Sequence, residues 1–138
     1  MNLNFDTGVK SYNVNGVEDA VRFNPADGVF LKKLCEAFKK LVASHEQFRP
    51  DTSGPDGQDA FDAAERLDLE ARREMDGLFG EGTCAAIFDK ASTCGSGGGL
   101  PAWMNFLLAV MDECNKSITE EQKKTSPALQ KYLKKYGK

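Results

Sequence analysis

Apolar and polar residues alternate at the beginning of the chain. The alternating apolar positions are Leu3, Phe5, Tyr12 and Val14, and a second apolar run covers residues 17–23. Asn15 and Gly16 stand between the two runs and adopt positive φ readily, as a tight hairpin turn requires. The pattern predicts an N-terminal β-hairpin over residues 1–23, and it is the only β signal in the sequence.

The spacing of the apolar positions then changes to alternating steps of three and four residues, which is typical of a helix that packs against another helix. These positions are Leu31, Leu34, Phe38, Leu41, His45 and Phe48. Asn24 is placed as the N-cap, Pro25 at the first helical position and Asp27 in the first turn. The pattern predicts a helix over residues 24–48.

A second helix with the same spacing is predicted over residues 58–79, and its opposite face is rich in Asp, Glu and Arg. Its apolar positions are Phe61, Ala64, Leu67, Ala71, Met75 and Leu78. Residues 49–57 contain two prolines and two glycines, so a mobile loop is expected between the two helices. Two long helices joined by a short loop predict an antiparallel helix hairpin.

The rest of the chain predicts two to three further helices. Gly80 is placed to end the second helix, and Thr83 to N-cap a short helix over residues 83–90. The glycine-rich residues 94–99 predict a flexible link to a core helix over residues 100–116. A C-terminal helical segment over residues 118–136 is expected to be interrupted by Pro127. The predicted fold is therefore α+β, mostly α, in a single domain over residues 1–138.

The predicted helix over residues 100–116 is apolar around most of its circumference, so it is expected in the core or in an interface. Together with the first helix it provides the candidate protein-binding residues, which are expected to be packing or contact residues. These are Trp103, Phe106, Leu107, Met111, Leu31, Leu34 and Phe38. The division between core and interface stays open at this point.

The net charge of −3 is divided unevenly along the chain. Residues 116–138 contain seven Lys and two Glu, a net charge of +5, which leaves −8 for residues 1–115. A lysine-rich end contacts nucleic acid or an acidic protein in some proteins, but it is more commonly a solvated face. Nucleic acid is disfavoured as a partner because no basic groove with interleaved aromatic residues is evident.

The sequence contains no recognisable catalytic, cofactor or metal motif. The four cysteines and the one histidine, His45, lack the spacing of a zinc site. The glycine run at residues 97–99 is not followed by the Gly-Lys-Ser/Thr of a phosphate loop. The carboxylates are scattered or interleaved with arginines, so no enzyme activity, cofactor or metal is expected.

A reducing, cytoplasmic location with free thiols is expected, since Met1 leads into polar residues rather than a signal peptide. A bridge between Cys84 and Cys94 stays open on spacing alone. The most apolar run, residues 100–111, is too short to cross a bilayer, so no membrane contact is expected.

Three stretches together carry a resemblance to a known family. They are Val14-Asn15-Gly16 through Arg22-Phe23-Asn24-Pro25 with Asp27, Leu78-Phe79-Gly80-Glu81, and Leu100-Pro101-Ala102-Trp103 through Ala109-Val110-Met111-Asp112-Glu113. The ending, with Glu121 through Pro127 and Lys131-Tyr132, also matches, whereas residues 53–57 and 97–99 do not. The chain resembles small phage and prophage proteins of unknown function, which are encoded in the structural gene clusters of tailed phages of Gram-positive gut bacteria.

This resemblance implies a role near the tail genes, where small acidic helical proteins are similar to tail assembly chaperones. The expected partner is a phage tail protein, in particular the tape-measure protein, and a homo-oligomer stays open. The alternatives are a structural tail or head-completion component of the virion and a DNA-associated regulator that uses the lysine-rich end.

Overall fold

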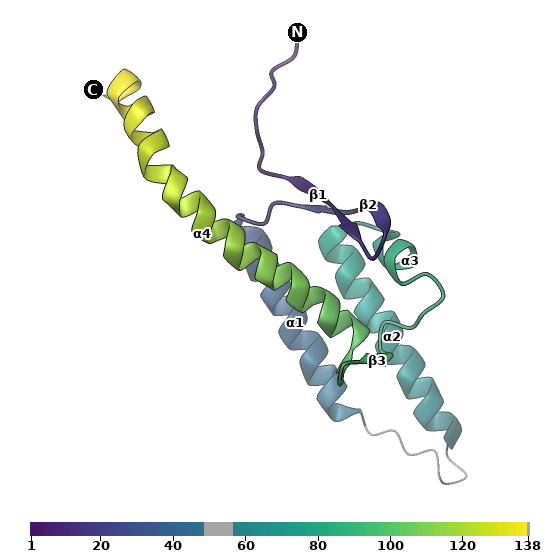
Figure 1. The fold of residues 1–138 in the computed structure, drawn as a ribbon. Coiled ribbons are helices and arrows are strands. Elements are labelled where there is room, and N and C mark those ends of the chain that lie inside the picture. The colour runs from purple at the N-terminus through teal and green to yellow at the C-terminus, as the bar shows by residue number, and fades with distance from the viewer. Residues whose placement is uncertain (49–56, 138) are drawn as a thin grey trace.

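The structure is a computed structural model that describes residues 1–48 and 57–137. Its elements are β1 (Lys10–Val14), β2 (Val17–Phe23), α1 (Gly28–Gln47), α2 (Gly57–Phe79), α3 (Thr83–Phe88), β3 (Ser96–Gly97), β4 (Leu100–Pro101) and α4 (Ala102–Tyr136) (Figure 1). The predicted fold class, α+β and mostly helical with an N-terminal β-hairpin and packed helices, is confirmed. None of the described helices is long and apolar enough to cross a membrane.

The N-terminal hairpin forms, but it is shorter than predicted. β1 and β2 pair antiparallel, with Lys10 opposite Phe23, and the turn has positive φ at Asn15 (48°) and Gly16 (84°). Residues 1–9 lie outside the strands, because β2 ends at Phe23 and offers no backbone to pair with them. Leu3 and Phe5 are consequently exposed, at 94% and 80%.

The first helix begins at Gly28 rather than at residue 24. Asp27 is its N-cap, and the Asp27 carboxylate accepts a hydrogen bond of 2.9 Å from the Val29 N–H. The Asn24 side chain is engaged elsewhere, since it accepts from the Ala26 N–H and donates to the Thr7 carbonyl. Asn24 therefore caps a turn before the helix, which is consistent with the avoidance of helical geometry before a proline.

α1 and α2 lie side by side and antiparallel, as predicted, and α4 packs against α1 (Figure 1). Polar contacts along the rim of the helix pair join Lys40 to Glu74 (2.6 Å) and Ser44 to Glu70 (2.9 Å). Of the loop predicted over residues 49–57, residues 49–56 lie outside the described residues, and Gly57 begins α2.

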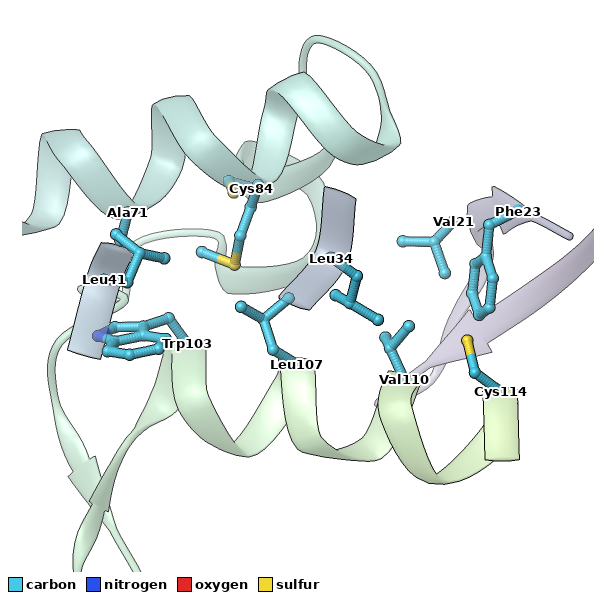
Figure 2. Close-up of a cluster of buried hydrophobic side chains, with 11 residues drawn as sticks. Val21, Phe23, Leu34, Leu41, Ala71, Cys84, Trp103, Leu107, Val110 and Cys114 are labelled. Carbon is cyan, nitrogen blue, oxygen red and sulfur yellow. The ribbon is translucent and has the colours of Figure 1, made fainter. Parts of the chain in front are cut away.

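The core lies where β2, α1, α2, α3 and α4 meet. Figure 2 shows side chains from these five elements turned toward one another. The largest fully buried hydrophobic side chains are Trp103, Leu34, Met75 and Leu107. Removing this apolar surface from water supplies most of the driving force for folding.

The glycine-rich stretch is not the flexible link that its composition predicts. Ser96 pairs with Pro101 and Gly97 with Leu100, so β3 and β4 form a second small hairpin. The turn consists of Gly98 and Gly99, both at positive φ (64° and 87°), a conformation that glycine adopts without a steric penalty. The Asn105 side chain also donates to the Gly97 carbonyl at 2.9 Å, which fastens this hairpin to α4.

The prediction of two separate C-terminal helices is wrong. α4 is one helix of 35 residues that continues through Pro127. Proline removes one backbone hydrogen bond from a helix, but helical residues continue on both sides of it in this exposed segment. The short helix also differs from its prediction, since Gly82 occupies the N-cap in place of Thr83 and α3 ends at Phe88 rather than at residue 90.

Candidate functional site

The seven candidate residues divide between two environments. Trp103, Leu34 and Leu107 are buried in the core, at 1% exposure or less, and are inaccessible to a partner in this conformation. The other four are partly buried and pack against that core; these are Phe106, Met111, Leu31 and Phe38. A packing role thus accounts for the spacing of all seven, and partner contact by the partly buried four stays a prediction.

The C-terminal half of α4 lies outside the core and is exposed. Ser117 is its last buried residue, and every residue from 119 to 137 is exposed. Figure 1 shows this half, in yellow-green and yellow, extending away from the other helices. Residues 119–137 are called the arm below.

The arm has one apolar face. The side chains of this face are Leu129, Tyr132, Leu133 and Tyr136, which are 53%, 52%, 54% and 69% exposed. They follow the spacing i, i+3, i+4 and i+7, which places side chains on one side of a helix. The ring centroids of Tyr132 and Tyr136 lie 6.4 Å apart with nearly parallel planes.

Lysines border this face. Lys131 Nζ lies 5.5 Å from the centre of the Tyr132 ring, and Lys135 Nζ lies 5.2 Å from the centre of the Tyr136 ring. These distances are within the range of cation–π attraction, which at exposed sites contributes about 0.5–1 kcal/mol. The arm thus combines an apolar face with a positively charged border.

A groove of about 560 Å³ lies where the arm leaves the body of the protein. Residues 6–10 and 24–26 line it on one side, and Ser117 and Glu121 line it on the other. The Asn24 amide holds the N-terminal segment there by donating to the Thr7 carbonyl at 3.0 Å. Gly8 has a φ of 79°, and a Cβ at this position would lie 2.5 Å from Asn24 Nδ2, so a glycine is required for this close approach.

A partly buried polar junction joins α2 to the segment before β3. Asp68 accepts hydrogen bonds from the Thr93 N–H (2.8 Å) and hydroxyl (2.7 Å), and forms an ion pair with Arg72 (3.1 Å). Arg72 also donates to the Ala91 carbonyl. Burial opposes ionisation of Asp68, but the bonds from Thr93 and Arg72 outweigh it and hold the pKa of this carboxyl below its usual value. The junction holds the segment before β3 in place, and its polar groups are hydrogen-bonded to one another.

Three of the thiols, Cys84, Cys94 and Cys114, are not prepared for nucleophilic chemistry. Burial, together with the Asp76 carboxylate, raises the pKa of Cys84 to about 12. Burial also raises the pKa of Cys94 and of Cys114. All four cysteines are free, so the bridge between Cys84 and Cys94 that spacing left open is not formed.

Two polar side-chain atoms are buried without a hydrogen-bond partner among the described residues, Tyr12 Oη and His45 Nδ1. Burial and then the Glu113 carboxylate raise the pKa of Tyr12. The His45 ring lies against Trp103, with centroids 6.4 Å apart. Since residues 103 and 113 are about 15 Å apart along a helix, the two groups do not share a pocket. In the described part of the chain, no three His, Cys, Asp or Glu residues are placed to hold a metal ion.

The sequence predicted only a C-terminal helical segment over residues 118–136 for this part of the chain. Tertiary contacts decide which residues of α4 are buried and which are exposed. The core of the described residues is completed by side chains up to Ser117, and none of its members comes from the arm. The arm is therefore the candidate functional site, and the adjoining groove extends it.

Comparisons of the chain with protein-family models, with curated proteins and with solved structures find no match to any of them.

Proposed function

We propose that this chain is a phage or prophage tail assembly protein of the bacterial cytoplasm. In this role it acts without catalysis, as a chaperone that binds a tail protein, the expected partner being the tape-measure protein. The observation that carries the proposal is the arm, whose apolar face is exposed along a helix that extends from the folded body. An amphipathic helix of this kind binds by laying its apolar face in a groove or against another helix.

The size of the apolar face fits a transient complex. Fully burying a Leu- or Phe-sized side chain contributes about 1.5–3 kcal/mol, so four half-exposed side chains supply about 5 kcal/mol before the costs of association. That amount does not sustain a permanent complex by itself. Weak binding suits a chaperone, because a chaperone must release its client when the tail tube assembles. The exposed N-terminal segment and the lysines provide further contacts.

A structural component of the virion is the first alternative, and a DNA-associated regulator is the second. The regulator has one observation in its favour, the seven lysines of residues 116–138. DNA binding through these lysines would weaken steeply as the salt concentration rises, because each phosphate contact releases counterions. Binding of a protein through the apolar face would depend on salt much less.

The test is co-expression of the chain with the tape-measure protein of the same gene cluster, followed by affinity purification and analysis of purified virions. A chaperone co-purifies with the tape-measure protein and is absent from virions. Presence of the chain in virions at a fixed stoichiometry supports the structural component instead. Failure to capture the tape-measure protein, together with salt-sensitive retardation of DNA, contradicts the chaperone and supports the regulator.

A further inference from the structure

A second exposed apolar pair lies on α2, at the opposite end of the molecule from the arm. Phe61 and Leu69 are each 58% exposed, and Glu65 lies between them along the helix. Residues at steps of four lie near one another on a helix surface, so the three side chains share one face. This set, Phe61, Glu65 and Leu69, is called the α2 stripe below.

The arm and the α2 stripe are complementary in charge. The lysines that border the arm, Lys131 and Lys135, are spaced by four residues, as are the members of the α2 stripe. Residues 119–137 contain five Lys and two Glu, a net charge of +3, and residues 57–79 contain seven Asp or Glu and three Arg, a net charge of −4, so the arm and α2 attract one another. The three arginines of α2, Arg66, Arg72 and Arg73, are fewer than its seven carboxylates, and Arg72 is held by Asp68 and the Ala91 carbonyl.

The same charges disfavour pairing between two arms. An arm-to-arm contact brings together two segments that each carry a net charge of +3, and the lysines beside the tyrosines of one arm face those of the other. Like charges in contact destabilise an interface. The α2 stripe is therefore a better match for the apolar face of the arm than a second arm is.

The contact has to form between two molecules. In Figure 1 the arm extends at one end of the protein, and the N-terminal half of α2 lies at the other end. A rigid arm therefore does not reach the α2 stripe of its own chain. We infer that the arm of one copy docks on the α2 stripe of a second copy, so that the chain self-associates head to tail.

Head-to-tail contact has a consequence for the assemblies formed. Each added copy leaves one free arm and one free α2 stripe, so the chain grows unless the rotation between copies closes a ring. The inference rests on that part of the proposed function in which the arm is a docking surface, and it needs no tail protein. Self-association also buries the apolar face of the arm when no client is bound, and a bound client would displace the second copy.

The experiment is sedimentation velocity of the purified full-length chain over a wide range of concentration. The arm variant carries Leu129→Gln and Tyr132→Gln, and the stripe variant carries Phe61→Gln and Leu69→Gln. Glutamine keeps helix propensity and adds no charge. Val29→Gln is the matched control, because Val29 is a 64% exposed apolar residue of α1 outside both surfaces. Circular dichroism checks that each variant is folded.

The wild type and the control are expected to self-associate, and each of the two variants to associate at least about tenfold more weakly. Mixing the two variants restores one intact contact, so heterodimers form and nothing larger does. A wild type that stays monomeric at every concentration overturns the inference. A stripe variant that associates like the wild type overturns it as well, because it indicates pairing between arms.

These outcomes are independent of the test of function. A monomeric wild type that still captures the tape-measure protein refutes the self-association and leaves the chaperone standing. A chain that self-associates through both surfaces but captures no tail protein leaves the self-association standing and refutes the chaperone.

Discussion

Tyr132 and Tyr136 stack one helical turn apart, with ring planes within 2° of parallel, on a part of α4 that is fully exposed. Two aromatic side chains thus already lie parallel to one another on the exposed face of the free protein. Tyrosine carries few rotatable bonds, so holding it for a partner costs little conformational entropy. The relationship separates two roles of one helix, whose first half completes the core and whose second half presents a surface.

This separation predicts that binding and folding respond to different substitutions in α4. The arm variant, Leu129→Gln with Tyr132→Gln, should unfold at the same temperature as the wild type, because neither side chain contacts the core. It should lose capture of the tape-measure protein. Leu107→Ala should lower the free energy of unfolding by about 2–5 kcal/mol, as expected for a buried leucine. Thermal denaturation and capture assays on both variants test this, and an arm variant that keeps full capture contradicts it.

The junction between Asp68 and Thr93 should contribute measurably to stability. Thr93→Val keeps the shape of the side chain but removes the hydroxyl that donates to Asp68 at 2.7 Å. Losing this one hydrogen bond to a charged carboxylate, which keeps the Thr93 N–H and Arg72 as partners, should lower the free energy of unfolding by about 1.5 kcal/mol in urea denaturation. Thr93→Ser keeps the hydroxyl and should lose only about 1 kcal/mol with its methyl group. A valine variant as stable as the wild type would show that the bond is worth little.

The lowered pKa of Asp68 predicts a dependence of stability on acid. A carboxyl whose pKa is lower in the folded protein stabilises it fully above the unfolded value of about 3.9, and this contribution is lost as the pH falls through the folded value. Asp68→Asn should therefore be less stable than the wild type at neutral pH, and the difference should shrink as the pH falls toward about 2. Urea midpoints of both proteins over this range test it. A difference that is constant with pH contradicts the assignment.

Cys84 should be chemically inert in the folded protein. With a pKa of about 12, only about one Cys84 thiol in ten thousand is ionised near pH 8, and the thiolate is the species that reacts with alkylating agents. Iodoacetamide followed by mass spectrometry should modify the partly exposed Cys35 first, and Cys84 only after unfolding in urea. Equal rates of modification at the two positions in the native protein would contradict the buried placement of Cys84.

The sequence predicted the fold class and the long helices because their apolar spacing is strong and local. Its errors lie where tertiary contacts decide between local alternatives. Asn24 and Asp27 are both good N-caps, and the contact of Asn24 with Thr7 settles which of them caps α1. From composition alone, Pro127 was expected to interrupt a helix and the glycine-rich residues 94–99 to form a flexible link. In the structure Pro127 lies within α4, and Gly98 and Gly99 form the turn between β3 and β4.

The candidate site was less predictable from the sequence than the fold. Trp103 and Leu129 are both apolar residues at helical spacing, and their local patterns do not distinguish a core position from an exposed one. Their exposures of 1% and 53% follow from where α4 leaves the other helices. That point depends on the lengths and packing of α1 and α2, which single residues do not encode.

Hydrogen exchange of α4 with and without the tape-measure protein tests the central claim most directly. A helical segment without tertiary contacts is marginally stable, so amides in residues 120–136 should exchange fast in the free monomer, and those in residues 103–117 slowly. Binding is predicted to slow exchange in residues 120–136 and to leave residues 103–117 unchanged. Binding of the tape-measure protein with no added protection in residues 120–136 would contradict the assignment of the arm as the docking surface.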